Sequence, residues 1–237
     1  MWASCRRRET GFGLQTPVVS TVWLFCVVAL STSSLFATPP STDFKKFMSV
    51  LSGRYGDKAS QRGRAWQEEL KTLEQMSVAE QLKGINRFFN QRIAWQSDAD
   101  IYGKDDFWAT PSETMGRGRG DCEDFTIAKY VSLRQLGVPS DQLRLTYVKL
   151  KKVGGRSQAH MVLAWYETPA ATPLILDNAN PNILPASQRR DLRPIFSFTS
   201  DALWVAGSNQ STNATPSSRL SQWRQMLTRA QAEGIML

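Results

Sequence analysis

The chain has 237 residues, of which 41% are hydrophobic and 21% are charged, and its formal net charge is +8. Once an export segment at its start is set aside, about 200 residues remain, enough for one well-cored domain and too few for two. The positive charge is spread along the chain without a basic run interleaved with aromatic residues, so we expect no nucleic acid partner.

Residues 1–37 have the pattern of a secretory signal peptide. Arg6-Arg7-Arg8 forms the positive region, Val18–Leu30 forms the apolar run, and small residues lead up to Ala37. The apolar run is shorter than the about 20 residues of a spanning helix. We therefore expect cleavage after Ala37 and a single periplasmic domain over residues 38–237, with an uncleaved N-terminal anchor as the alternative.

The predicted domain begins with three helices. Apolar residues at helical spacing predict the first from about residue 44, closed by Gly53 and Gly56, and the second over residues 58–75. The third opens at Ser77-Val78-Ala79-Glu80, which matches a capping box. These amphipathic patterns predict a helical layer at the start of the domain.

A long stretch without clear periodicity, residues 94–120, comes next. Its aromatic residues argue for order, so we expect an irregular but ordered loop with a functional role. A further helix is predicted from Cys122 to Leu136, where Gly137-Val138-Pro139 ends it.

The pattern then changes to the two-residue period of β-strands. Strands are predicted over residues 143–148, 159–166, 173–177 and 195–199. A polar segment, residues 207–218, is typical of a linker, and residues 219–232 are predicted as a closing amphipathic helix. This order of elements predicts an α+β fold in which the helix that begins at Cys122 packs on an antiparallel sheet.

The predicted mature domain contains one cysteine, Cys122, and one histidine, His160. Cys122 begins a helix, His160 lies on a strand, and Asp177 ends the next strand, an arrangement typical of nucleophilic cysteine chemistry. The helix N-terminus and an imidazolium would both lower the pKa of the thiol. Asp177 would orient the ring, with Asn178 or Asn180 as alternatives. We therefore take Cys122, His160 and Asp177 as the candidate catalytic residues.

Attack on a carbonyl produces an oxyanion, which needs hydrogen-bond donors at the site. The backbone N–H of Cys122 is a natural donor to the oxyanion, and the indole N–H of Trp108 is a candidate for a second donor.

The alternative to a catalytic role for Cys122 and His160 is a structural one, because a lone cysteine is often a small buried hydrophobic residue and a lone histidine on a strand often serves the fold. The order of the three residues and their settings favour catalysis.

Three carboxylates lie next to the candidate nucleophile, and these are Asp121, Glu123 and Asp124. They should raise the pKa of the thiol and oppose the thiolate. One explanation is helix capping, with Asp121 as the N-cap residue. The other is a bound Ca²⁺, which prefers carboxylate and carbonyl oxygens and would offset the negative charge, with Asp105 or Asp106 as further donors.

The run Gly116–Asp124, the strand around His160 and the strand end Leu176-Asp177-Asn178 resemble the bacterial transglutaminase-like cysteine proteinases. The resemblance extends over nearly all of residues 38–237. It implies a papain-like, transglutaminase-type fold with Cys122, His160 and Asp177 as the triad. It also implies Ca²⁺ dependence through the acids beside the nucleophile, here Asp121 and Glu123, with Asp124 as a third.

The same resemblance implies a role and two partners. It implies a periplasmic endopeptidase that cleaves a large, acidic, repeat-rich surface adhesin near its N-terminus, at a di-alanine site. Cleavage would release the adhesin and disperse the biofilm, and an inner-membrane receptor for cyclic-di-GMP would sequester the protease. Two alternatives stay open, an acyl transferase of transglutaminase type and a non-catalytic binding module of the same fold.

Overall fold

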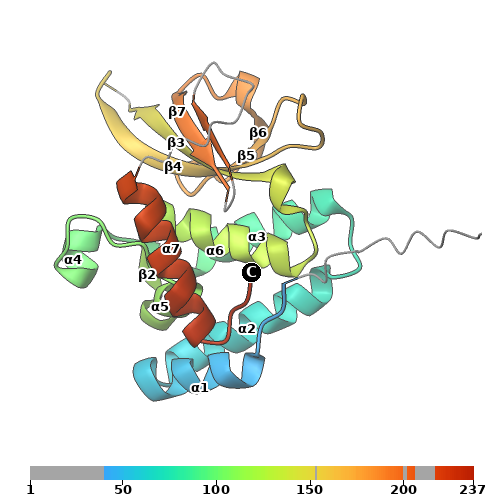
Figure 1. The fold of residues 1–237 in the computed structure, drawn as a ribbon, viewed down its shortest axis with the longest axis vertical. Coiled ribbons are helices and arrows are strands. Elements are labelled where there is room, and N and C mark those ends of the chain that lie inside the picture. The colour runs from blue at the N-terminus through green and yellow to red at the C-terminus, as the bar shows by residue number, and fades with distance from the viewer. Residues whose placement is uncertain (1–39, 153, 200–201, 206–216) are drawn as a thin grey trace, which may run out of the picture. The chain divides into compact units, whose positions relative to one another are not determined.

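The computed structural model describes residues 40–152, 154–199, 202–205 and 217–237, with the backbone alone for residues 217–220 (Figure 1). The predicted signal peptide, residues 1–37, lies outside these residues, as does most of the predicted linker. Residues 38–237 form one unit. Within its described part, no helix combines the length and the apolar character needed to cross a membrane.

The three predicted helices at the start are present, as α1 (Phe44–Tyr55), α2 (Asp57–Leu73) and α3 (Val78–Arg92). Gly56 separates the first two and has φ 77°, a backbone conformation that glycine adopts without strain. Gly53 lies inside α1 and does not end it. The capping box predicted for α3 is formed, because the Ser77 N–H donates to Glu80 and the Glu80 N–H donates to Ser77.

Residues 94–120 are ordered, but the prediction of an irregular loop is wrong. They form β1 (Ala94–Trp95), α4 (Asp98–Tyr102), α5 (Pro111–Arg117) and β2 (Arg119–Gly120). Local caps start both helices, with Ser97 accepting the Asp100 N–H and Thr110 forming a capping box with Glu113. Strands β1 and β2 pair in parallel, which places Trp95 opposite Gly120, just before the next helix.

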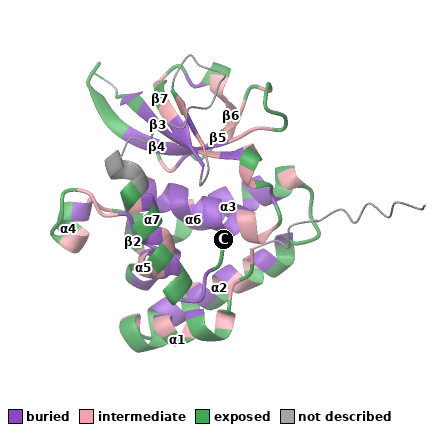
Figure 2. Ribbon diagram, viewed as in Figure 1, coloured by how far each residue is buried: buried purple, intermediate pink, exposed green. Residues whose placement is uncertain are grey.

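Helix α6 (Cys122–Gln135) lies between the other helices and the sheet, and most of its side chains are buried (Figures 1 and 2). The Trp66 indole of α2 donates to Ser132 of α6 at 2.8 Å. On the other side, the Thr126 hydroxyl donates to the Met161 carbonyl of the sheet. Helix α6 therefore forms the core of the unit, and its first residue is the candidate nucleophile.

The sheet is antiparallel and has the strand order β6-β5-β4-β3-β7-β8. The strands are β3 (Leu143–Lys151), β4 (Ser157–Trp165), β5 (Leu174–Leu176), β6 (Leu184–Pro185), β7 (Leu192–Phe198) and β8 (Leu203–Val205). Two 3₁₀ turns, η1 (Ser140–Gln142) and η2 (Ala186–Gln188), precede β3 and β7. Four strands match predicted ones, whereas the short edge strands β6 and β8 were not predicted.

The closing helix α7 (Ser217–Ala232) packs on α6, where the Trp223 and Tyr130 rings meet edge to face with centroids 5.5 Å apart. Its C-terminal end is tied to the start of α1 by a hydrogen bond from the Asp43 N–H to the Gly234 carbonyl. The architecture confirms the predicted α+β class, with the helix of Cys122 packed on an antiparallel sheet.

Candidate active site

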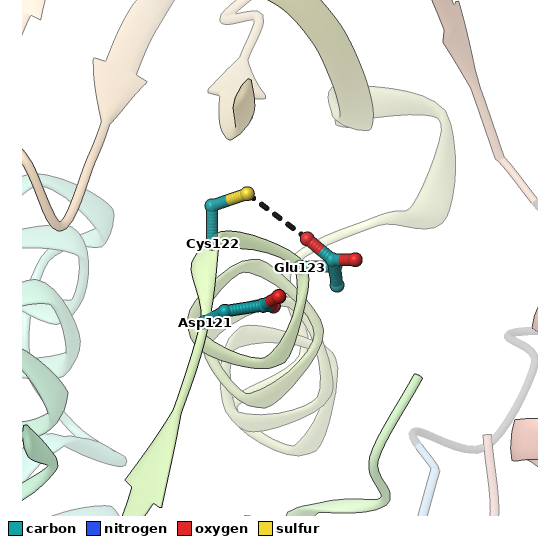
Figure 3. A group of neighbouring side chains, drawn as sticks. All are labelled: Asp121, Cys122 and Glu123. Atoms are coloured by element: carbon teal, nitrogen blue, oxygen red, sulfur yellow. Dashed lines mark hydrogen bonds between the residues drawn. The ribbon is translucent and has the colours of Figure 1, made fainter. Parts of the chain in front are cut away.

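Cys122 is the first residue of α6, and the chain reaches it through Gly120. A Cβ atom added at Gly120 would lie 2.7 Å from the Asp124 Cβ, so only glycine fits this close approach. The Cys122 Sγ donates a hydrogen bond to Glu123 Oε2 at 2.9 Å (Figure 3). Burial and the charges of Glu123 and Asp121 raise the pKa of the Cys122 thiol, although the Met161 N–H acts in the opposite direction.

His160 lies on β4 and Asp177 follows β5. The antiparallel pairing of Leu163 with Leu176 brings the end of β5 back towards the His160 end of β4. His160 Nε2 lies 2.7 Å from Asp177 Oδ1, and both side chains are buried. Asp177 is thus the acid at the ring, and neither predicted alternative, Asn178 nor Asn180, takes that place.

The thiol and the imidazole line one cleft, whose volume is about 330 Å³. Its other lining residues are Trp95, Asp105, Asp106, Asp121, Glu123, Tyr147, Gln158 and Ala159. Because Asp177 engages Nε2, Nδ1 is the ring nitrogen of His160 left for the thiol. The structure therefore places Cys122 and His160 at one cleft and joins His160 to Asp177, which brings the three predicted residues into one site.

The acids near Cys122 gather into one cluster, joined by Asp98 of α4, in which Asp98, Glu123 and Asp124 are buried and Asp106 and Asp121 are half-buried. Carboxylate oxygens of Asp98, Asp121 and Asp124 lie within 4.8 Å of one another, as do those of Asp98, Asp106 and Glu123. Burial raises the pKa of Asp98 to about 6, and burial with neighbouring carboxylates raises that of Asp121 as well. Such crowded carboxylates repel one another unless positive charge is supplied.

Two carboxylate oxygens of this cluster accept no hydrogen bond from the described residues. Asp98 Oδ1 and Asp121 Oδ1 are buried without a hydrogen-bond partner among the described residues. Asp124 already accepts the Ala109 N–H at 2.8 Å and the Asp121 N–H at 3.3 Å. Buried carboxylate oxygens without donors suit a hard cation such as Ca²⁺, so the residues present fit the predicted ion.

The predicted role of Trp108 is wrong. Its indole N–H donates to Asp106 Oδ1 at 3.1 Å, and its ring is buried near Phe198, with centroids 5.8 Å apart. Trp108 therefore supports Asp106 and the core, and the indole N–H is not directed at an oxyanion.

Two buried basic side chains beside Asp177 were not predicted. Arg189 Nη2 donates to Asp177 Oδ2 at 2.7 Å, and its side chain is 2% exposed. Lys129 of α6 is 1% exposed, and burial lowers its pKa to about 7 although Asp177 acts in the opposite direction. The sequence carries little signal for either, because Arg189 precedes another arginine and Lys129 looks like a surface position.

The family of bacterial transglutaminase-like cysteine proteinases matches residues 53–192, more than half of the chain, including the thiol, the imidazole and the acidic cluster. The chain belongs to this family. The proteinase is also similar to the EGTA-treated structure of Legionella pneumophila LapG, at 38% identity and a TM-score of 0.69, over 81% of this chain and 99% of that one. These matches confirm the predicted family and fold.

The calcium-bound structure of Legionella pneumophila LapG is 40% identical, with a TM-score of 0.66, over 78% of the proteinase and 98% of that chain. No curated protein gives a significant match. The similarity covers nearly the whole of LapG, so the proteinase is LapG-like in sequence and architecture, and its class is that of a cysteine protease.

Proposed function

We propose that the chain is a Ca²⁺-dependent periplasmic cysteine endopeptidase with Cys122 as nucleophile, His160 as general base and acid, and Asp177 as the acid that orients the ring. The observation that carries this proposal is the His160–Asp177 hydrogen bond of 2.7 Å in the cleft that holds the Cys122 thiol. Membership in a family of cysteine proteinases supports it.

The first half of the reaction forms a thioester. His160 Nδ1 takes the thiol proton while Cys122 Sγ attacks the scissile carbonyl carbon. The oxyanion that results lies at the N-terminus of α6, where the Cys122 N–H donates to it. The C–N bond then breaks as Nδ1 returns its proton to the leaving amine, and Asp177 stabilises the imidazolium through Nε2.

The second half releases the acyl group. Water loses a proton to His160 Nδ1 and attacks the thioester carbonyl, and the C–S bond breaks as the proton passes to sulfur. The products are a carboxylic acid and the free thiol, so no other reactant is consumed. An amine in place of water would give acyl transfer, the reaction of the alternative transglutaminase-type enzyme.

The metal proposal rests on the acidic cluster. Asp98, Asp121, Glu123 and Asp124 would hold the ion, with Asp106 as a further donor. A bound Ca²⁺ supplies positive charge that offsets these carboxylates. Glu123 would then be engaged as a ligand, which leaves the Cys122 thiol to His160. A calcium-bound form of LapG, similar over most of this chain, supports the proposal.

The proposed substrate is a large, acidic, repeat-rich surface adhesin, cut near its N-terminus at a di-alanine site and thereby released from the cell. An inner-membrane receptor for cyclic-di-GMP is the proposed partner that sequesters the protease. Both follow from the resemblance of this chain to the bacterial transglutaminase-like cysteine proteinases. Residues 1–37 contribute three arginines and Glu9, so the proposed mature domain keeps a net charge of +8 − 2 = +6, which favours an acidic protein substrate. Release of the adhesin would disperse the biofilm.

The test is to incubate the purified protein with an N-terminal adhesin fragment that contains the di-alanine site. We expect two shorter fragments in Ca²⁺, none after EGTA, and recovery on adding Ca²⁺ but not Mg²⁺. Cys122→Ala should be inactive, and Ser52→Ala, at an exposed position of α1, should behave as wild type. A fluorescent amine joined to the fragment would favour acyl transfer, and adhesin release that persists in Cys122→Ala would favour a binding module.

A further inference from the structure

The two carboxylate oxygens of Asp177 face different side chains. Oδ1 lies 2.7 Å from His160 Nε2 and accepts the Ala179 N–H at 2.9 Å. Oδ2 accepts a hydrogen bond from Arg189 Nη2 at 2.7 Å. Both ends of the carboxylate are therefore occupied, and its rotation about the Cβ–Cγ bond is fixed from two sides.

Arg189 is itself held in place. Its Nε and Nη2 donate to the two oxygens of Asp191 at 2.9 and 2.8 Å, a two-pronged contact that fixes the guanidinium plane. Its backbone N–H donates to the Ala186 carbonyl of η2 at 3.1 Å. A continuous chain of contacts therefore runs from Asp191 through Arg189 and Asp177 to His160.

The titratable groups around Asp177 come from three parts of the chain. His160 faces it from β4, Lys129 acts on it from α6, and Arg189 with its partner Asp191 lies after η2. Helix α3 contributes a neutral group, the Asn90 amide, which donates to the Asp177 backbone carbonyl at 2.8 Å. Of these basic side chains, Arg189 holds the Asp177 oxygen that His160 does not contact.

These contacts keep Asp177 ionised in a buried place. Burial by itself would raise the pKa of Asp177, but the hydrogen bond and charge of His160, the Ala179 N–H and Arg189 hold it at about 2. A carboxylate that stays charged and cannot turn accepts a hydrogen bond from Nε2, which favours the imidazole tautomer that carries its proton on Nε2. The ring nitrogen towards the thiol is then the unprotonated one.

We propose that Arg189 is a positioning residue for catalysis, which fixes the Asp177 carboxylate and, through it, the tautomer of His160. The proposal rests on the proposed function, because it assigns Arg189 to the same triad. The residue touches neither substrate nor the reacting atoms, and its effect passes through Asp177.

The chain contains one histidine, so its imidazole can be observed without ambiguity. In protein labelled with ¹⁵N-histidine, long-range NMR correlations distinguish a ring protonated at Nε2 from one protonated at Nδ1. We expect the Nε2 form in the wild type and a mixture of tautomers in Arg189→Met. We also expect kcat on the adhesin fragment to fall about ten- to hundredfold, with KM little changed.

Arg190→Met is the matched control, because Arg190 is the neighbouring arginine and is exposed. It should keep the wild-type tautomer and kcat. A folded Arg189→Met variant, judged by circular dichroism and its Tm, with both properties of the wild type would overturn the proposal.

Arg189→Lys covers the case in which Arg189→Met does not fold, since it keeps the charge and loses the fork to Asp191. We expect partial tautomer mixing and an intermediate kcat, and a wild-type tautomer with wild-type kcat would again overturn the proposal. The tautomer is measured without substrate, so the role of Arg189 can be tested independently of the proposed protease function. Full activity of Cys122→Ala refutes the proposed function, whereas an unchanged ring in the Arg189 variants refutes the role of Arg189.

Discussion

The Cys122 thiol donates its hydrogen bond to Glu123, the next residue in the chain, over 2.9 Å. The same carboxylate contributes to the acidic cluster with Asp98 and Asp106. Glu123 thus has two competing partners, the thiol and the proposed cation. With the thiol as its partner, it holds the proton on sulfur and opposes the attack that His160 would promote.

Glu123→Gln should therefore weaken Ca²⁺ binding and cleavage together. An amide is a poorer calcium ligand than a carboxylate, and we expect the affinity to fall about tenfold or more. Calorimetric titration with Ca²⁺ measures the affinity, and cleavage of the adhesin fragment at several Ca²⁺ concentrations measures activity. Glu74→Gln, at an exposed position after α2, is the control. An unchanged affinity would remove Glu123 from the ligand set.

Asp98→Asn should stabilise the protein without Ca²⁺ and reduce the stabilisation that Ca²⁺ gives. In EGTA the substitution removes one charge from the acidic cluster and keeps an oxygen for the Phe107 N–H, so we expect about 1–3 kcal/mol of added stability. In Ca²⁺ it removes a ligand, and the rise in Tm on adding the ion should shrink. Asp105→Asn, which is exposed at the cleft, should change neither quantity much. A Tm in EGTA that falls for Asp98→Asn would contradict this reasoning.

Lys129→Met should stabilise the protein at neutral pH. Burial lowers the pKa of Lys129 from 10.5 to about 7, so the folded state disfavours the charged ammonium. The resulting loss of stability, roughly 3–5 kcal/mol, is complete below pH 7 and fades as the pH rises towards 10.5. Urea unfolding of both proteins across this range gives the difference. We expect it to narrow with rising pH, whereas a constant difference would show that packing alone is responsible. Lys83→Met, an exposed site on α3, is the control.

Gly120→Ala should disturb the start of α6. The added Cβ would lie 2.7 Å from Asp124 Cβ and 2.8 Å from Asp124 Oδ2, so either the backbone at residue 120 or the Asp124 side chain must shift. We expect a loss of about 1–3 kcal/mol in the free energy of unfolding, together with lower activity. Gly53→Ala is the matched control, because it lies within α1 with open space around it and should gain about 0.5–1 kcal/mol. Equal effects at the two positions would argue against the close contact with Asp124.

The long helices and the central strands could be predicted because their apolar residues recur with the period of the element. Helices α4 and α5 could not, since each is short and is started by a local cap, Ser97 or Thr110, that resembles ordinary loop sequence. The edge strands β6 and β8 are two and three residues long, which is too short for an alternating pattern.

In the candidate site, scarcity pointed to Cys122 and His160, and the end of a predicted strand pointed to Asp177. Asp98 was missed because its place beside Asp121 depends on the pairing of β1 with β2, which brings distant parts of the chain together. Arg189 was missed because the sequence offers two adjacent arginines, and only the fold turns one of them inward. Contacts that depend on the tertiary structure leave no local pattern in the amino-acid sequence.

The short ladder of β1 and β2 has a consequence for the energy of ion binding. Backbone hydrogen bonds from Ala94 to Gly118 and from Gln96 to Gly120, each of 3.0 Å, close residues 96–118 into a ring. Asp98 stands just inside one end of that ring, and Asp121 lies just beyond the other. Folding therefore already includes the loss of chain entropy that brings Asp98 and Asp121 together. Binding of an ion between them would require little further ordering of the chain, so its affinity would be reduced little by loss of chain entropy.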